Sequence, residues 1–353
     1  MIKKNNSQHG IRLLVTVATL VIIVWGINQA QSVLASFLVA VFLAVIGTPP
    51  VLWLERKRIP SVFAVLLVVT GMITILVIVG AVVGTSVNSF YAQLPVYQTR
   101  LQEQVSAFQT FWETKGVLGT DKILLGYVNP GAVMSMTARL LAGLGSTLSN
   151  IVLILITVAF ILLEASSFPV KLRAVLHSRQ VFPQFTGFVG DIERYMIIKT
   201  LISLTAGILI GTWLFILGVD FPILWGFLAF LLHYVPNVGF LIAAIPAVLL
   251  TLIQLGIGSA SFAAAGYLTI NFVLGNMVEP KLMGRRLGLS TLVVFLSLVF
   301  WGSLLGLIGV ILCIPLTMTL KFACENNKGT QWIAILLGPE AIAESIPPGS
   351  KKG

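Results

Sequence analysis

Charged residues are scarce in this chain of 353 residues. Asp, Glu, Lys and Arg together make up 10% of the sequence, whereas a soluble domain carries about 25%. Hydrophobic residues make up 57%, and the mean hydropathy is +1.01. Several apolar runs exceed the ~18 residues that indicate a transmembrane helix. The composition therefore excludes an ordinary soluble domain and predicts an all-α polytopic membrane protein.

Cysteine and histidine are also rare, with two and three residues. Cys313 lies in an apolar run and Cys324 beside a basic end, so we expect neither a disulfide nor the clustered ligands of a metal site. His9 and His177 fall in the N-terminus and in a loop, which leaves no credible catalytic triad, and the P-loop motif GxxxxGK(S/T) does not occur. The sequence predicts no enzyme, no metal and no cofactor.

Positive charge is in excess, with a net charge of +10. Because Lys and Arg gather in the cytoplasmic loops of membrane proteins, we interpret this excess as a topology signal, with membrane lipid and not nucleic acid as the partner. Lys3, Lys4 and Arg12 precede the first apolar run, and no convincing cleavage site follows. We therefore expect a retained first helix and a cytoplasmic N-terminus.

The apolar runs predict membrane helices over residues 11–27, 33–53, 61–87, 149–163, 200–217 and 261–278. Residues 88–148 lack a strong spanning signal, but apolar side chains recur there at three- and four-residue spacing from Leu94 to Trp112. This spacing predicts an amphipathic helix outside the membrane. It either gathers or gates a substrate, or it lies on the bilayer surface or between subunits. Residues 185–195 predict a further interfacial helix.

Two longer apolar tracts, residues 221–255 and 289–321, are each broken near the middle. Because a lipid-facing backbone must satisfy its own hydrogen bonds, each break predicts two half-helices that meet inside the protein or beside a wet cavity. Residues 227–233 resemble 295–301, and residues 245–252 resemble 314–320, with offsets of 68 and 69. Two similar broken tracts that enter from opposite sides indicate an inverted-repeat transporter with two re-entrant hairpins.

The distribution of charge favours these hairpins over the alternative of eight straight crossings. With hairpins, the loop that carries Lys281, Arg285 and Arg286 is cytoplasmic, as is the C-terminus. Only four of the 22 Lys and Arg then lie outside, all in the long segment 88–148. With eight straight crossings, this basic loop falls outside, against the positive-inside rule.

Three stretches carry a resemblance to a known family. They are Glu279–Ser290, with the sequence EPKLMGRRLGLS; the tract through Trp301-Gly302, Gly306, Gly309 and Ile314-Pro315; and Tyr234–Gly239, with the sequence YVPNVG, followed by Ala244–Pro246. These residues resemble the autoinducer-2 exporter family of bacterial membrane proteins. The resemblance implies export of the quorum-sensing signal autoinducer-2 through the cell inner membrane, by a homo-oligomer such as a pentameric ring. It also implies a cytoplasmic loop motif made of Glu279, Pro280, Gly284, Arg285, Arg286 and Gly288.

Few polar residues lie at membrane depth, and they are the substrate-binding candidates: His233, Asn237, Asn271, Asn276 and Ser303. Unwound hairpin tips expose backbone groups, and half-helix ends offer partial charge. An uncharged polyol suits amides, hydroxyls and an imidazole. The alternatives are interhelical hydrogen bonds for the two asparagines and an interfacial position for His233. The residues expected to shape the hairpins are Pro236, Gly239, Pro246, Gly302, Gly306, Gly309 and Pro315.

We therefore predict five segments: transmembrane helices in 1–87, an extracytoplasmic amphipathic segment in 88–148, two helices with a basic cytoplasmic loop in 149–220, a transport core in 221–322, and a cytoplasmic tail in 323–353. The predicted function is secondary transport or facilitated export. One alternative is a monovalent cation/proton antiporter that uses Glu164, His233 or Glu279. A loop ion pair of Glu279 with Lys281 or Arg285 is the competing interpretation of that carboxylate. A second alternative is a non-transporting membrane scaffold.

Overall fold

The computed structural model describes residues 15, 18, 19, 22, 24–114, 151–165, 181–236, 238–283, 288–325 and 329–338. Every regular element within these ranges is helical, which confirms the all-α prediction. Among the described residues, five helical stretches are long and apolar enough to cross a membrane, and they confirm a polytopic protein: Gln31–Arg56, Ser61–Arg100, Phe185–Leu217, Gly239–Met283 and Thr291–Ile311.

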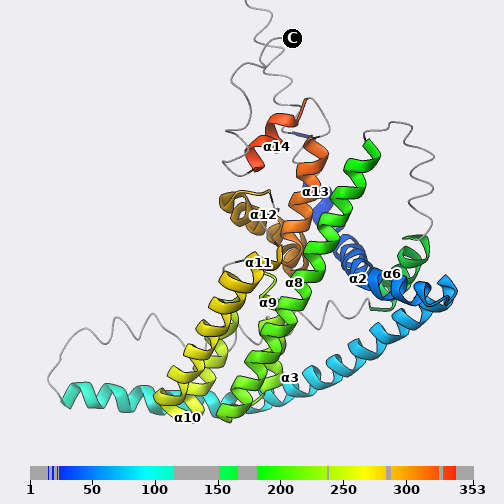
Figure 1. Cartoon of the computed structure of the whole chain (residues 1–353). Coiled ribbons are helices and arrows are strands. Elements are labelled where there is room, and N and C mark those ends of the chain that lie inside the picture. The colour runs from blue at the N-terminus through cyan, green and yellow to red at the C-terminus, as the bar shows by residue number, and fades with distance from the viewer. Residues whose placement is uncertain are drawn as a thin grey trace, which may run out of the picture.

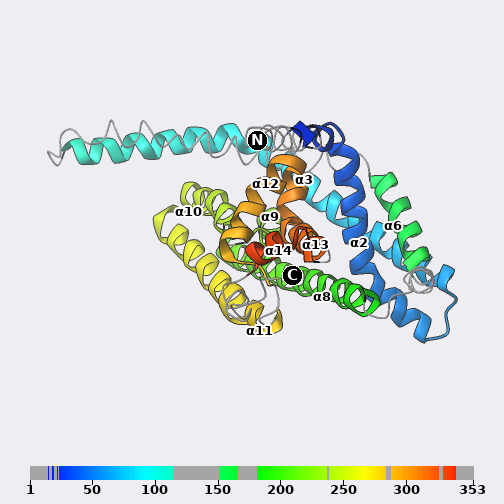
Figure 2. The same cartoon turned by 90° about the horizontal axis from the view of Figure 1, so that it is seen from above.

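Three helices build one side of the molecule: α2 (Gln31–Arg56), α3 (Ser61–Thr114) and α6 (Ile151–Ala165). Small residues on the inner faces let them approach closely. Ala40, Ala64 and Val158 are fully buried in their shared core. The 54 residues of α3 span about 80 Å, and Figure 2 shows its C-terminal part extending beyond the other described helices.

The sequence prediction divided two of the observed helices into shorter pieces. Residues 61–87 and the amphipathic stretch after them form one helix, α3, because Val83, Val87, Phe90 and Tyr97 continue a single buried face along it. Residues 185–195 and 200–217 likewise form one helix, α8 (Val181–Leu217). From Phe188 to Leu214, half-buried and then buried side chains recur along α8 at three- and four-residue spacing.

The first broken tract contains α9 (Pro222–Leu232) and the first limb of α10 (Gly239–Asn271). α9 packs tightly on α8: a methyl group on Gly207 would lie 2.7 Å from the Gly226 carbonyl oxygen. The chain turns after Leu232, and at Gly256 a φ of 82° reverses it again into the second limb of α10. Where α9 begins and the first limb of α10 ends, the backbone N–H of Asp220 donates to Gln254 Oε1 at 3.1 Å.

The second broken tract contains α12 (Thr291–Ile311), which bends at Gly306 with a φ of 62°, and α13 (Cys313–Glu325). Trp301 Nε1 donates to Thr317 Oγ1 at 3.0 Å, and Lys321 Nζ donates to the Gly288 carbonyl at 2.7 Å. The beginning and the end of this tract therefore lie side by side. Figure 1 shows α10 reaching the lower end of the molecule and α13 running to the upper end, beside α14 (Gln331–Leu337).

Each of the two tracts has a glycine in close contact with a backbone carbonyl oxygen near its bend. A Cβ on Gly239 would overlap the Leu232 carbonyl oxygen, and a Cβ on Gly309 would overlap the Trp301 carbonyl oxygen. The two glycines are 70 residues apart and the two carbonyls 69. These separations are within two residues of the predicted repeat offsets of 68 and 69, and a glycine near each bend permits the close approach. The depth of both tracts in a bilayer remains a prediction.

Two short helices follow α10: the π-helix η1 (Phe272–Val278) and α11 (Glu279–Met283). The prediction of a loop beginning at Glu279 is therefore wrong for Glu279–Met283, because these residues are helical. Gly288 does lie outside a helix, with a φ of 60°. Gly284, Arg285 and Arg286 of the predicted loop motif lie outside the described residues.

Candidate functional site

The five predicted substrate-binding residues do not form one cluster. His233 is buried in the turn after α9, and Asn271 is half-buried at the end of α10. Asn276 is exposed on η1. Ser303 is also exposed, and its hydroxyl donates to the Phe300 carbonyl of its own helix at 2.8 Å. Asn237 lies outside the described residues. Of the described candidates, only His233 is buried in the interior, and Asn271 is half-buried.

A buried ion pair lies beside His233. Lys199 Nζ of α8 is 2.8 Å and 3.0 Å from the two carboxylate oxygens of Glu279 in α11. The Lys199 side chain is 5% exposed and that of Glu279 is 21% exposed. His233 Nε2 lies 3.9 Å from Glu279 Oε2. Glu279 thus pairs with a lysine 80 residues away and not with Lys281. Arg285, the other expected partner, lies outside the described residues.

Sequence reasoning missed Lys199 because it counted this lysine among the cations of a cytoplasmic loop. The spacing of the sequence could have revealed that Lys199 is buried. Tyr195, Lys199 and Ser203 are four residues apart and share one face of α8. All three are buried. An ionisable residue on the buried face of a membrane helix is rare and usually serves a function.

Three buried polar side chains have no hydrogen-bond partner among the residues that the structure describes: Ser203 Oγ, His233 Nε2 and the Tyr267 hydroxyl. Other buried hydroxyls bond back to their own helix, as Thr251 does to the Ala247 carbonyl at 2.7 Å. Ser203 does not. Because more than nine in ten buried polar groups in proteins are paired, three such groups in one region need an explanation.

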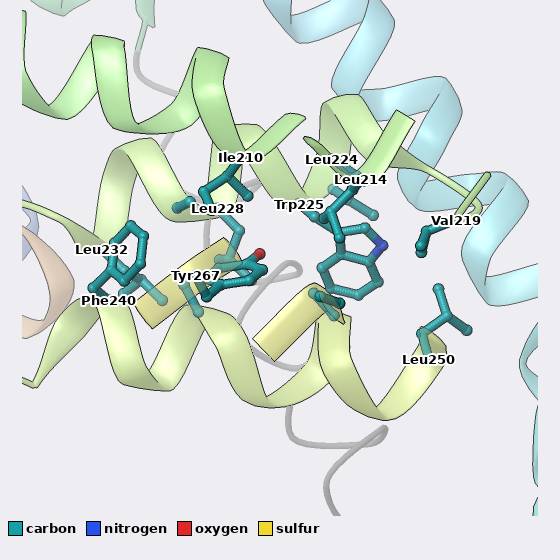
Figure 3. Close-up of a cluster of buried hydrophobic side chains, with 14 of the residues drawn as sticks. Ile210, Leu214, Val219, Leu224, Trp225, Leu228, Leu232, Phe240, Leu250 and Tyr267 are labelled. Atoms are coloured by element: carbon teal, nitrogen blue, oxygen red, sulfur yellow. The ribbon is translucent and has the colours of Figure 1, made fainter. Parts of the chain in front are cut away.

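The surroundings of Tyr267 are apolar, as Figure 3 shows: its ring lies among side chains of α8, α9 and α10 that include Ile210, Leu228 and Phe240. The Phe240 ring links two of the unpartnered groups. Its centroid is 5.6 Å from that of His233 and 5.3 Å from that of Tyr267. A few polar atoms in an otherwise apolar setting are typical of small-molecule sites.

The π-helix explains how Tyr267 and Glu279 come to share a face. Tyr267, Asn271, Gly275 and Glu279 are spaced four apart, and in an α-helix each such step drifts by about 40° around the axis. Three steps would turn Glu279 about 120° away from Tyr267. A π-helix has more residues per turn, so η1 offsets this drift. π-Helical turns occur frequently at functional sites.

The charges and donors of this cluster define what it can bind. The Lys199 and Glu279 charges offset each other, which leaves two hydroxyls and an imidazole as unpaired groups. No group of three His, Cys, Asp or Glu that could hold a metal ion occurs within the described ranges. The cluster therefore suits a small neutral polar molecule.

Comparison with known proteins identifies relatives over almost the whole chain. The model of the family described as "AI-2E family transporter" matches residues 13–328. The chain is 38% identical to "AI-2 transport protein TqsA" of Escherichia coli (strain K12), over 96% of this chain and 98% of that protein. It is 34% identical to "Putative transport protein YhhT" of the same strain, over 97% and 98%. A "Putative transport protein" of Haemophilus influenzae is 34% identical over 95% and 98%.

Proposed function

Because this chain belongs to the AI-2E family of transporters, we propose that it exports a small polar metabolite, the quorum-sensing signal autoinducer-2, through the bacterial inner membrane. The relative named for AI-2 transport supports the choice of substrate. The observation that carries the proposal is the set of three unpartnered polar atoms inside the apolar core. The protein alone would pay an energetic penalty for burying them, whereas a polar substrate satisfies them.

The two broken tracts are the proposed re-entrant hairpins. α9 has 11 residues and spans about 16 Å, half of the ~30 Å hydrocarbon core of a bilayer. Leu298 and Val310 of α12 pack against the core formed by α8, α9 and α10, so the second tract contacts the core that contains the first. Two half-membrane helices in contact with one core favour a substrate site at mid-depth.

The transporting unit in this proposal comprises both hairpins and the second limb of α10. It moves against α2, α6 and the N-terminal part of α3, whose shared hydrophobic core is separate from the core around α8, α9 and α10. The apolar side chains exposed on α3, such as Phe63 and Ile75, face lipid or another copy of the chain in a homo-oligomeric ring. Both termini lie in the cytoplasm, as the charge distribution favours.

The test is efflux of labelled autoinducer-2 from proteoliposomes, with and without imposed proton and sodium gradients. A facilitator lets the signal run down its own gradient, and a coupled exporter responds to an imposed ion gradient. We expect Asn237→Leu to abolish efflux and a cross-link between α2 and α12 to stop it. Efflux that continues through the cross-linked protein would refute the moving unit. Absence of any flux would favour a membrane scaffold.

A second candidate function is exchange of a monovalent cation for protons. The pair of Lys199 and Glu279, with His233 beside it, favours this function, because a carboxylate that alternates between a lysine, a proton and a cation can couple their movements. The same liposomes test it with pH- and sodium-sensitive dyes. Sodium-driven proton movement that Glu279→Gln removes, without movement of autoinducer-2, would decide for antiport.

A further inference from the structure

Two contacts align α8 with the helical stretch made of the second limb of α10, η1 and α11. Trp213 Nε1 donates to the Phe262 carbonyl at 3.2 Å, and at the other end Lys199 pairs with Glu279. Between these contacts, α8 contributes Ser203 and α10 contributes Tyr267. Both side chains are almost fully buried, at 0% and 1% exposure. Two of the three unpartnered groups therefore belong to the two helical stretches that form this interface.

The third group, His233, enters this interface from the turn of the first hairpin. Its Nε2 lies 3.9 Å from Glu279 Oε2, at the end that Lys199 closes. Its ring contacts Phe240, whose ring in turn contacts Tyr267. Hydroxyls and a neutral imidazole both donate and accept hydrogen bonds, so the three groups complement a ligand that does the same.

The surroundings restrict the chemical class of this ligand. An anion would meet the Glu279 carboxylate, and a cation would meet the Lys199 ammonium. A neutral molecule meets neither penalty. The carbon skeleton of a small polyhydroxylated compound fits against Leu228, Leu232 and Phe240. Neutral hydroxyl and carbonyl groups are therefore the class that this region recognises.

We infer that Ser203, His233 and Tyr267 form the binding subsite for a small neutral polyhydroxylated ligand, with the ion pair of Lys199 and Glu279 closing one end of it. The inference rests on the proposed function and adds residues that sequence reasoning did not identify, Ser203 and Tyr267. It also explains why Ser203 does not bond to its own helix: its hydroxyl is kept for the ligand.

The test uses the full chain in lipid nanodiscs and measures the Kd of labelled autoinducer-2, together with efflux from proteoliposomes and thermal stability. Tyr267→Phe and Ser203→Ala each delete one hydroxyl that has no partner in the described protein. We expect each to raise Kd about tenfold, the effect of one hydrogen bond at the upper end of its usual strength. Thermal stability stays at the wild-type value or rises, because each change removes an unsatisfied buried group.

Tyr234→Phe is the matched control. It deletes the hydroxyl of another buried tyrosine, but this hydroxyl donates to Thr200 Oγ1 at 2.8 Å. We expect lower thermal stability and an unchanged Kd, which is the reverse of the pattern for Tyr267→Phe.

The outcomes separate this subsite from the function on which it rests. If wild type binds and exports autoinducer-2 while Tyr267→Phe and Ser203→Ala match it in Kd, the subsite is overturned and the function stands. If the folded wild-type protein neither binds nor moves this compound, both are overturned. Weaker binding by both variants, with stability retained, supports the subsite.

Discussion

The buried pair of Lys199 and Glu279 should respond asymmetrically when either partner is neutralised. Glu279→Gln leaves an ammonium group on a side chain that is 5% exposed, whereas Lys199→Met leaves a carboxylate on one that is 21% exposed and better hydrated. Breaking a buried pair by removing one partner costs about 3–5 kcal/mol, because the other charge stays buried. We expect about 4 kcal/mol for Glu279→Gln and about 2–3 kcal/mol for Lys199→Met.

The double variant Lys199→Met/Glu279→Leu is the decisive comparison. It removes both charges, and apolar replacement of a buried pair is often neutral or stabilising. We therefore expect its stability to return close to wild type. The assay is thermal unfolding of the purified protein in one detergent, where a loss of 4 kcal/mol lowers Tm by roughly 8 °C. Glu325→Gln is the control and changes Tm very little, because the Glu325 side chain, 3.5 Å from Lys321, is 49% exposed.

Two results would refute this reasoning. If the double variant is as unstable as Glu279→Gln alone, the loss comes from disturbed side-chain contacts and not from an uncompensated charge. If Glu279→Gln unfolds at the wild-type temperature, the pair is hydrated and does not behave as a buried one. Either result would also remove the reason to treat Lys199 as part of the site.

Three further predictions concern the broken helices. Gly239→Ala and Gly309→Ala each force a methyl group onto a backbone carbonyl oxygen, so we expect little folded protein in size-exclusion chromatography. Gly258→Ala is the control, because Gly258 has open space around it, and we expect this variant to elute as wild type. Gly226→Ala places a methyl group 2.6 Å from a backbone oxygen of α8, and we expect it to lower Tm by separating α8 from α9. Ser303→Ala removes an exposed hydroxyl bonded within its own helix, and efflux unchanged from wild type would confirm that Ser303 does not bind substrate.

Sequence reasoning identified only part of the candidate site. His233 stood out because an imidazole interrupts an apolar tract. Tyr267 did not, because an aromatic residue in a membrane helix is usually read as core, and only the missing partner of its hydroxyl distinguishes it. Asn276 and Ser303 were chosen because they are polar, but polarity does not tell whether a side chain faces the interior.

Hydropathy and charge were enough to predict an all-α membrane protein with two tracts broken near their middles, because these are local properties that the chain carries whatever its neighbours are. The bends at Gly239 and Gly309 were also predictable, since glycine is the residue that lets two backbone segments touch. The partner of Glu279 was not. Lys199 is 80 residues away, and which lysine meets this carboxylate depends on how α8 packs along α10 and on the extra rotation of η1. Contacts between distant segments are decided by tertiary packing, so the site itself emerges only from the folded chain.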